Sequence, residues 1–418
     1  MILAAYVLFT SKMDLADEYE EYISQARSYA EQGIVSKSAE AYDSAIAMND
    51  IFELNMEKAQ MYSDNEYGVM AIESGEELVK KYPKDVRAYE FLLNQYFESK
   101  EYSDFFELKK ETEKRHLTSD RINELYNEIE YLYELNYSGY DQAKNFSNGF
   151  WAVARDDSWG YLDEYGSRVI DFKYKSAKQF VLDVAAVEEQ DGSWYYIDSN
   201  AEKAVVPSSD IKVKDLGVYT QLIAISNDGK YGYYDHNFAY KFGEYDYAGS
   251  FNCGVAPVKI GNEWVLINEN GEKITESKFE DVVMDEKGVA FRNDRAFVKT
   301  SDGYIMIDTA GNRIGTDLYK AAEVFVDNGP AAVKIGSKWG FVGTDGKLVI
   351  NADYDNAHSF CYGLAAVCKN GRWGYINEES ELCIDYAFED ALNFNEKGVS
   401  MVLDDNDWVV LLLTKYNY

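Results

Sequence analysis

Residues 339–375 read WGFVGTDGKLVINADYDNAHSFCYGLAAVCKNGRWGY, and this stretch begins and ends on the same kind of motif. Trp339-Gly340-Phe341 returns as Trp373-Gly374-Tyr375, 34 residues later. Between them, apolar segments such as Leu348-Val349-Ile350 alternate with turn-forming pairs such as Asn370-Gly371. Alternation of this kind is typical of short β-strands joined by tight turns. The stretch therefore predicts one unit of a β-repeat, built as a three-stranded meander.

The same unit recurs through the last two-thirds of the chain. Six of the seven Trp residues lie at near-fixed intervals, and two Tyr residues fill the gaps. The intervals in chain order are 35, 37, 33, 40, 35, 34 and 35 residues. The eight anchor positions are Trp159, Trp194, Tyr231, Trp264, Tyr304, Trp339, Trp373 and Trp408. Because one meander cannot bury both of its faces, neighbouring units must stack. We expect the anchors to pack between units, with a ligand-binding role as the alternative.

A second element follows each meander: an aromatic residue, then Ala and Phe at steps of three. Complete copies run from Tyr140 to Phe146, Tyr174 to Phe180, Tyr245 to Phe251, Tyr319 to Phe325, Tyr354 to Phe360 and Phe388 to Phe394. Steps of three predict one tight helical turn, or corner, between units. The unit around residues 211–217 has lost this corner, and the unit that starts at Phe279 keeps only its first aromatic. These two units are expected to be distorted.

These repeats resemble the bacterial WG (KWG) repeat. Trp159-Gly160-Tyr161 and the two motifs quoted above carry the resemblance, which covers residues 140–418. Four units depart from it, because Tyr195, Val265, Ile305 and Val409 replace the Gly. The resemblance implies a β-rich repeat array with no established chemistry. We expect an open, curved array of about eight three-stranded units, since the repeat step varies from 33 to 40 residues; a closed propeller is the alternative.

Residues 14–136 show a helical period in place of the β pattern. Small and aromatic residues recur in three units, at Tyr22, Ala26, Tyr29, Tyr42 and Ala45, at Ala71, Leu78 and Pro83, and at Tyr89, Leu92, Leu93, Tyr96, Tyr102 and Phe105. This spacing resembles the tetratricopeptide repeat, with about 34 residues per helical pair. The match is loose and covers residues 16–115. We predict a degenerate tetratricopeptide-like solenoid, with an unrelated helical bundle as the alternative, capped by a last helix from Ser119 to Leu135.

The two regions are expected to share a fixed junction, so that the chain has a two-domain α plus β organisation. The corner from Tyr140 to Phe146 has no strands before it, whereas the unit of Trp408 has no corner after it. We predict that Tyr140, Ala143 and Phe146 pack on the first β unit. The helix that ends near Leu135 should cover the exposed face of that unit.

The first 13 residues begin with the apolar run MILAAYVLFT, about half of what a membrane-spanning helix needs. They form either the end of a longer membrane anchor or an apolar tail on the first helix. Acidic residues dominate just after the run, which favours an extracytoplasmic location over a cytoplasmic one. Cys253, Cys361, Cys368 and Cys383 include no C-x-x-C pair and are expected to be small buried thiols. A Cys361–Cys368 disulfide is the alternative in an exported chain.

Charge and motif content restrict the function. The chain has 41 basic and 74 acidic residues among 418, a net charge of −33, and this repels nucleic acid. No catalytic motif, cofactor fingerprint or metal-ligand spacing is present, and His116, His236 and His358 lack partners in the sequence. We therefore predict a non-catalytic protein without cofactor or metal, whose stacked repeats bind a protein or peptide. The net charge favours a basic partner.

A second class of function is recognition of cell-envelope carbohydrate. The chain has 36 Tyr residues, and the segment Ser193-Trp194-Tyr195-Tyr196-Ile197-Asp198 is similar to the hairpins of cell-wall-binding repeats. Exposed aromatic rings next to Asp and Asn suit sugar rings, whereas ordinary strand packing is the competing explanation for these tyrosines. The sequence assigns no residue to ligand binding in either class.

Overall fold

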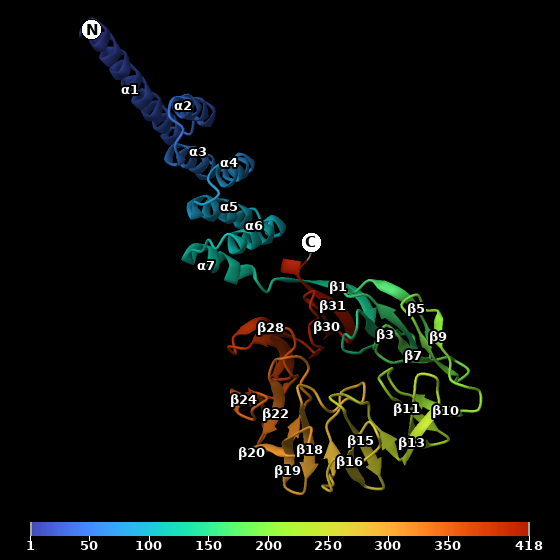
Figure 1. Ribbon diagram of the computed structural model, residues 1–418. Coiled ribbons are helices and arrows are strands. Elements are labelled where there is room, and N and C mark those ends of the chain that lie inside the picture. The colour runs from blue at the N-terminus through green and yellow to red at the C-terminus, as the bar shows by residue number, and fades with distance from the viewer. Residues whose placement is uncertain (1, 417–418) are drawn as a thin grey trace. The chain divides into compact units, whose positions relative to one another are not determined.

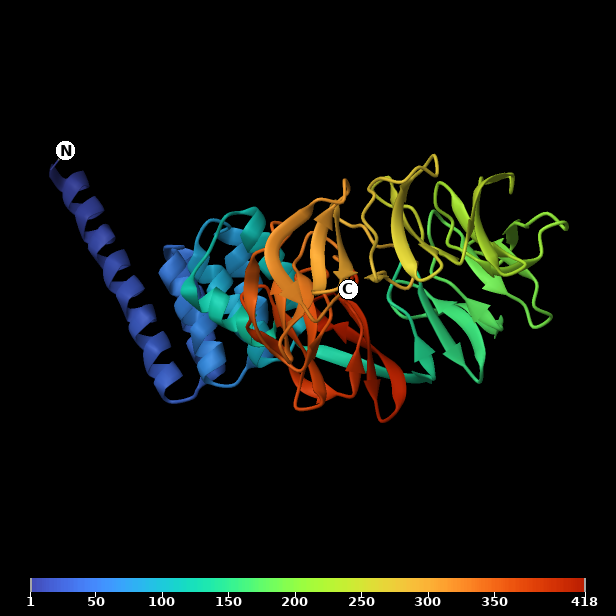
Figure 2. The same ribbon diagram turned by 90° about the horizontal axis from the view of Figure 1, so that it is seen from below.

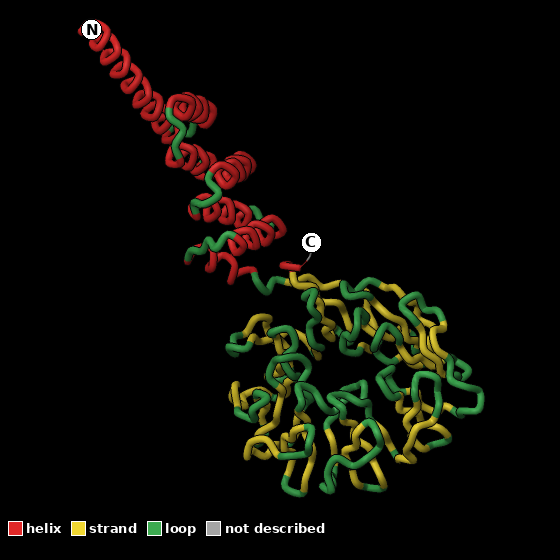
Figure 3. Tube along the Cα trace, viewed as in Figure 1, coloured by secondary structure: helices red, strands yellow, loops and turns green. Residues whose placement is uncertain are grey.

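The computed structural model describes residues 2–416, with side chains from residue 15 to residue 415. The chain divides into a helical unit that ends at Leu132 and a β unit from Tyr133 to Tyr416. Figure 3 shows this change from helix to strand along the trace. Each unit is described by itself.

The described part of the helical unit contains seven helices. They are α1 (Ile2–Glu31), α2 (Val35–Met48), α3 (Phe52–Asp64), α4 (Gly68–Lys81), α5 (Val86–Glu98), α6 (Tyr102–Lys114) and α7 (Asp120–Ile129). The helices α2, α4 and α6 begin at residues 35, 68 and 102, so equivalent helices lie 33 and 34 residues apart. This arrangement is consistent with the expected tetratricopeptide-like pairs.

Small residues allow these helices to approach one another closely. Ala26, Ala45 and Ala71 are fully buried in the first core cluster. The Ser38 hydroxyl donates to the Ala26 carbonyl at 2.8 Å and joins α1 to α2. Gly75 leaves room for Leu92 of the next pair, whose Cδ1 would lie 3.0 Å from an added Cβ. Most of the residues singled out for their period therefore lie in the core between helices, whereas Tyr22, Tyr29 and Tyr102 are half-buried at its edge.

The expected last helix is too long. α7 ends at Ile129, and Tyr133 begins strand β1 (Tyr133–Tyr140), so the expected helix from Ser119 to Leu135 and the expected helical region up to residue 136 both extend too far. The segment alternates half-buried Tyr133 and Leu135 with exposed Glu134, a period of two that suits a strand. Pairing with a strand near the C-terminus decides the conformation, and this partner is not visible from local sequence.

The expected apolar tail of residues 1–13 falls within α1, apart from Met1, which lies outside the described residues. Among the helices of the described segment, none combines the length and the apolar character needed to cross a membrane.

The β unit consists of eight sheets, here called blades; seven have their strands hydrogen-bonded in chain order, and in the eighth β1 lies beside β31. Blade 1 contains β2 (Gln142–Ala143), β3 (Trp151–Arg155), β4 (Ser158–Leu162) and β5 (Arg168–Tyr174). Blade 2 contains β6 (Ser176–Ala177), β7 (Ala185–Glu188), β8 (Trp194–Ile197) and β9 (Lys203–Val205). Blade 3 contains β10 (Val213–Leu216), β11 (Ile223–Asn227), β12 (Lys230–Tyr234) and β13 (Tyr240–Tyr245). Blade 4 contains β14 (Tyr247–Ala248), β15 (Val255–Ile260) and β16 (Glu263–Asn268).

The remaining blades follow the same order. Blade 5 contains β17 (Asp281–Val282), β18 (Arg295–Thr300), β19 (Gly303–Asp308) and β20 (Arg313–Tyr319). Blade 6 contains β21 (Ala321–Ala322), β22 (Ala331–Ile335), β23 (Lys338–Val342) and β24 (Leu348–Tyr354). Blade 7 contains β25 (Asn356–Ala357), β26 (Leu364–Lys369), β27 (Arg372–Asn377) and β28 (Leu382–Phe388). Blade 8 contains β29 (Asp390–Ala391), β30 (Val399–Asp404), β31 (Asp407–Leu413) and β1, and a short 3-10 turn, Thr414–Tyr416, follows.

Strand β1 closes the ring. It runs antiparallel to β31, with Tyr133 opposite Leu413 and Tyr140 opposite Trp408. Figures 1 and 2 both show the teal β1 beside the red final strands, with the blades following one another around the ring. The expected open array is therefore wrong, and the alternative, a closed propeller of eight blades, is the fold. The variable repeat step does not open the ring because the extra residues lie in loops.

The expected corner is a strand, not a helical turn, and the blades are therefore four-stranded rather than three-stranded. In blade 1, Gln142 pairs with Ala154 and Ala143 pairs with Val153, so the corner residues form the innermost strand. Blade 4 is the exception, because its fourth strand is reduced to two bridges, from Trp264 to Phe279 and from Ile267 to Lys273. The unit around residues 211–217 keeps an innermost strand in spite of its lost aromatic, but the pairing of β10 with β11 has a register shift between Val213 and Asp215.

The core of the β unit lies between neighbouring blades. Ala152 and Tyr161 of blade 1 pack with Ala185 and Ile197 of blade 2. Across the closure, Tyr140 packs with Trp151 of blade 1 and Val410 of blade 8. Ala143 and Phe146 pack against the same cluster, so the predicted packing of these three residues on the first β unit is confirmed. The prediction that the helical unit covers the face of this first β unit stays a prediction.

Candidate functional site

The eight anchor residues occupy one equivalent position. Each anchor is the first or second residue of the third strand of its blade, counted from the innermost strand. These strands are β4, β8, β12, β16, β19, β23, β27 and β31. Trp194, Trp264 and Trp373 are buried, and the other five anchors are half-buried. In seven blades the anchor lies opposite the aromatic residue that begins the next corner, as Trp159 lies opposite Tyr174 and Trp408 opposite Tyr140. The anchors therefore belong to the packing of the propeller.

The glycine after the anchor is required by a close approach of the neighbouring strand. A Cβ added at Gly160, Gly340 or Gly374 would lie 2.6, 2.7 or 2.4 Å from the carbonyl oxygen of Ile170, Ile350 or Ile384. At Gly232 the nearest atoms are a Tyr240 ring carbon at 3.0 Å and the Gly243 oxygen at 3.2 Å. Where Tyr195 or Val265 replaces the Gly, the outer strand is short, as in β9, or reduced to bridges, as in blade 4. Blades 5 and 8, with Ile305 and Val409 in place of the Gly, keep full outer strands whose pairing has a register shift.

The loops between the innermost and second strands, here called the inner loops, meet around the axis of the ring. They are linked from blade to blade by repeated hydrogen bonds. The Lys144 ammonium donates to the Ala177 carbonyl at 2.7 Å, and the Ser147 hydroxyl donates to the Phe180 carbonyl at 2.8 Å. At the closure, the Asn393 amide donates to Asn145 Oδ1 at 3.1 Å. Hydrogen bonds therefore connect inner loops of neighbouring blades at one end of the propeller.

Charged residues follow the innermost strands at equivalent positions. Lys178 pairs with Asp215 at 2.6 Å, and His358 Nδ1 lies 2.8 Å from Glu323 Oε1. The His358 ring stacks on Trp373, with centroids 4.9 Å apart and an angle of 12°. Burial opposes protonation of His358, but the Glu323 carboxylate outweighs it and raises the pKa of the imidazole. His358, which lacks a visible partner in the sequence, is thus ion-paired in the fold.

The inner loop of blade 5 is longer than the others. It runs over residues 283–294, 12 residues, whereas the other seven inner loops have six to eight. The Glu286 carboxylate accepts from Gln179 Nε2 at 2.7 Å in blade 2 and from the Asn145 amide at 3.3 Å in blade 1. The Lys287 ammonium donates to Ser147 Oγ at 3.2 Å. This loop therefore crosses the ring to the opposite blades.

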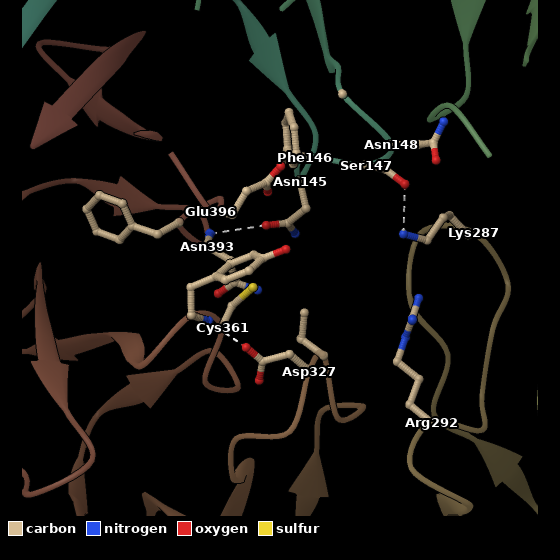
Figure 4. Close-up of a pocket in the computed structure, with 14 residues that line it drawn as sticks. Asn145, Phe146, Ser147, Asn148, Lys287, Arg292, Asp327, Cys361, Asn393 and Glu396 are labelled. Atoms are coloured by element: carbon tan, nitrogen blue, oxygen red, sulfur yellow. Dashed lines mark hydrogen bonds between the residues drawn. The ribbon is translucent and has the colours of Figure 1, made fainter. Parts of the chain in front are cut away.

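A cavity of about 300 Å³ lies between this long loop and the inner loops of blades 6, 7, 8 and 1 (Figure 4). Lys287 and Arg292 extend from the long loop on one side of the cavity. Asp327 of blade 6 and Glu396 of blade 8 supply carboxylates on the other side. Polar and aromatic lining comes from Asn145, Asn393, Phe146, Tyr362 and Phe394. A concave site with a few convergent polar groups is the usual form of a binding site.

The two cations have different partners. Arg292 donates to Asp285 Oδ2 at 2.6 Å, so this guanidinium is ion-paired. Among the described residues, Lys287 contacts Ser147 Oγ and has no carboxylate within 4.0 Å. Burial lowers the pKa of Lys287, the charges of Asp285 and Glu286 partly offset this, and the nearby Arg292 charge lowers it further. The ammonium therefore has an unmet need for an anion.

The opposite side of the cavity is electronegative. The Asp327 carboxylate accepts from the Tyr362 amide at 2.5 Å and from the Gly329 amide at 2.7 Å, which holds the inner loops of blades 6 and 7 together. Burial, followed by the charges of Asp327 and Glu396, raises the pKa of the Cys361 thiol to about 12. This thiol is therefore protonated at neutral pH and is a poor nucleophile.

None of the cavity residues was predicted to bind a ligand from the sequence. The available signal was the interval of 40 residues between Trp264 and Tyr304, which marks the long loop. His116 is exposed, and His236 is exposed with its Nε2 2.8 Å from the Thr220 carbonyl. Within residues 15–415, no group of His, Cys, Asp and Glu side chains is arranged to hold a metal ion.

The expectation that all four cysteines are buried is wrong. Cys361 and Cys368 are buried thiols that are not bonded to each other, Cys253 is exposed, and Cys383 is half-buried. Cys253 occupies a tight turn with a φ of 50° between β14 and β15, and its Sγ lies 3.9 Å from the Phe291 carbonyl oxygen of blade 5.

Comparison with known proteins identifies the repeats. The β unit is an eight-bladed propeller, a fold that supports a binding or scaffold role in general. A model of the WG containing repeat matches residues 159–194, 231–264, 339–373 and 373–408. Each match begins at an anchor that is followed by Gly, so the chain carries WG repeats at four places in its C-terminal region.

More distant similarities are weak. No curated protein matches the chain. Solved structures that resemble it include Hsv2p of Kluyveromyces lactis, with 12% identity over 65% of this chain and 96% of that chain, at a TM-score of 0.39. Apo AztD of Citrobacter koseri has 11% identity over 65% and 93%, at 0.37. The Pan2 WD40 domain of Neurospora crassa has 11% identity over 58% and 89%, at 0.32. Similarities this distant carry no functional inference.

Proposed function

We propose that the chain is a non-catalytic binding or scaffold protein that captures a protein or peptide partner at the inner-loop end of its propeller. The observation that carries this proposal is the cavity between the inner loops, with exposed apolar side chains at the same end of the ring. Leu182 is 62% exposed and Tyr362 is 55% exposed, both on tight turns of inner loops. Large apolar side chains held on rigid turns are typical anchors for a partner.

The charge of the chain supports a basic partner. A net charge of −33 attracts cationic segments and accelerates their association at low ionic strength. Asp327 and Glu396 place two of these acidic groups at the cavity itself. Binding of a basic peptide should therefore weaken as salt is added.

The hairpin that favours carbohydrate binding in the sequence is buried in the structure. The similar hairpin forms β8, in which Trp194, Tyr195 and Tyr196 are 9%, 4% and 0% exposed. Buried rings cannot stack on a sugar, so this motif gives no support to glycan binding. The tyrosines of β8 are explained by strand packing.

A selection experiment tests the proposal. Random peptides displayed against the immobilised full-length chain should yield binders enriched in Lys and Arg, with affinity that falls as ionic strength rises. The same preparation is applied to a glycan array. Saturable binding to glycans without any peptide binder would contradict the proposal.

Matched variants locate the binding surface. Tyr362→Ser should weaken the selected peptides at least tenfold. Tyr240→Ser is the control, because Tyr240 is also 55% exposed but lies on the outer strand β13 of blade 3. Equal losses in the two variants would place the binding surface elsewhere.

A further inference from the structure

The long inner loop of blade 5 presents two cationic side chains to the cavity. Lys287 and Arg292 both extend into it from residues 283–294 (Figure 4). The loop is held in place from three blades, because Ser250 of blade 4 donates to the Lys287 carbonyl at 2.6 Å while Glu286 is bonded to blades 1 and 2. The positions of the two cations are therefore fixed by the fold.

Of the two cations on this side of the cavity, only Arg292 has a carboxylate in direct contact. Asp285 pairs with Arg292, and its Oδ1 also accepts from the amides of Lys287 and Val289. The Glu286 carboxylate is bonded to Gln179 and Asn145 and acts on Lys287 only through its charge, without a direct contact. Within the described residues, the Lys287 ammonium keeps only the neutral Ser147 hydroxyl as a hydrogen-bond acceptor. A largely buried ammonium without a carboxylate in direct contact is costly, and a ligand can supply that contact.

We propose that this cavity binds one carboxylate of the peptide partner, with Lys287 and Arg292 as its cationic contacts. That the ligand is a peptide rests on the proposed function. Arg292 has guanidinium nitrogens beyond the one bonded to Asp285, and planar donors of this kind suit a carboxylate. The cavity volume of about 300 Å³ lies at the small end of ligand sites, which fits the end of a chain or one side chain.

The surroundings favour a singly charged anion over a phosphate. Asp327 and Glu396 lie across the cavity and would repel a second negative charge on the ligand. The same two carboxylates can receive an amine or a basic side chain from the ligand. The expected ligand therefore presents a carboxylate to one side of the cavity and positive charge or N–H donors to the other.

Three small probes test this with the full-length chain by titration calorimetry, at up to about 10 mM. They are acetyl-Lys-Ala with a free terminal carboxylate, the same dipeptide as its terminal amide, and acetyl-Lys-Glu-amide, which moves the carboxylate to a side chain. We expect at least one acid probe to bind and the amide of the first to bind at least tenfold more weakly. Equal binding of acid and amide, or no binding by either acid, would overturn the inference. The difference between the two acid probes shows whether the carboxylate is terminal.

Variants connect the binding to the residues named. Lys287→Met and Arg292→Gln should each weaken the acid probe at least tenfold, whereas Lys338→Met should not, because Lys338 pairs with Asp355 outside the cavity. Far-UV CD verifies folding, and Lys287→Met alone decides the outcome if Arg292→Gln unfolds with Asp285 left unpaired. Unchanged affinity in a folded Lys287→Met variant would refute the assignment. Inorganic phosphate as a stronger competitor than acetate would refute the preference for a single charge.

The two proposals can fail separately. Selected peptides that bind a Lys287→Met variant as well as the native chain would overturn the carboxylate site and leave the proposed function standing. Binding of an acid dipeptide without any selected peptide would support the site and count against the protein-partner proposal.

Discussion

Substitution of Gly374 by Ala tests whether the glycine of the WG motif is dictated by the neighbouring strand. The added Cβ would lie 2.4 Å from the Ile384 oxygen and 2.9 Å from the carbonyl carbon and oxygen of Asp385. Even attractive carbon–oxygen contacts settle at about 3.3–3.6 Å, so the overlap is close to 1 Å. All three atoms are backbone, and relief requires β28 to move away from β27.

The cost of this movement can be estimated. Overpacking in a dense interior costs about 1–3 kcal/mol, and a backbone neighbour places Gly374→Ala near the upper value. About 3 kcal/mol lowers the Tm of a large domain by roughly 6–12 °C. Thermal unfolding of the full-length chain, followed by CD or calorimetry, measures this shift.

A graded series and a control make the test specific. The loss should decrease from Gly374→Ala through Gly160→Ala and Gly340→Ala to Gly232→Ala, because the nearest contacts are 2.4, 2.6, 2.7 and 3.0 Å. Gly343→Ala is the control, since the closest atom there is Oδ1 of the Asp345 side chain at 3.3 Å, and a shift of a few tenths of an ångström relieves this contact. A Tm for Gly374→Ala within about 2 °C of the control would refute the steric explanation.

Three further predictions address the anchors, the closure and pH. Trp373→Ala should destabilise the chain by about 3–5 kcal/mol, and Trp339→Ala should cost less because Trp339 is only half-buried; equal values in denaturant titrations would contradict this. Asn136 lies opposite Val410, so Asn136→Pro should open the β1–β31 ladder. Amide hydrogen exchange should then increase in β31 but not in β27. An unchanged exchange rate in β31 would show that closure does not depend on β1. The Glu323 carboxylate raises the pKa of His358, so the pair's contribution to stability is fully present below about pH 6.5 and is lost as pH rises through the folded-state pKa. The difference in unfolding free energy between the native chain and His358→Gln should therefore shrink from pH 6 to pH 9. A constant difference would exclude this linkage.

The repeat was predictable from the sequence because its signal is local and recurrent. Rare Trp residues at a near-constant interval identify equivalent strand positions, and the glycine that follows is decided by contact within one blade. The helical pairs were predictable for the same reason, since burial of Ala26 or Tyr89 follows from neighbours within one or two helices. Both inferences needed only contacts at short sequence separation.

Closure was not predicted, although its signal was present. The corner at Tyr140 has no meander before it, and the unit of Trp408 has no corner after it. In the structure these incomplete pieces complete each other, with Tyr140 opposite Trp408 as Tyr174 is opposite Trp159. The expected helix extends to Leu135 and the expected corner begins at Tyr140, so the sequence leaves no strand where the structure has β1.

The cavity could not be predicted once closure had been missed. Lys287, Asp327, Tyr362 and Asn145 lie on the inner loops of four blades, and only a closed ring brings these loops around one axis. The sequence marks the long loop by its interval but does not show that Glu286 and Lys287 reach blades 1 and 2. A binding site built from many repeats depends on the global curvature, which local patterns do not encode.

The origin of the closing strand has a consequence for synthesis of the chain. Tyr133 pairs with Leu413, so β1 leaves the ribosome 280 residues before its partner. At a translation rate of about 5–20 residues per second, β1 stays without its partner strand for roughly 14–56 s. Blades 1 to 7, in contrast, complete their own sheets as they emerge from the ribosome. A chain that stops early, or that is cut between β30 and β31, would keep seven finished blades and still expose both ends of the arc to chaperones and proteases. Completion of the ring therefore reports that translation has reached the last strand.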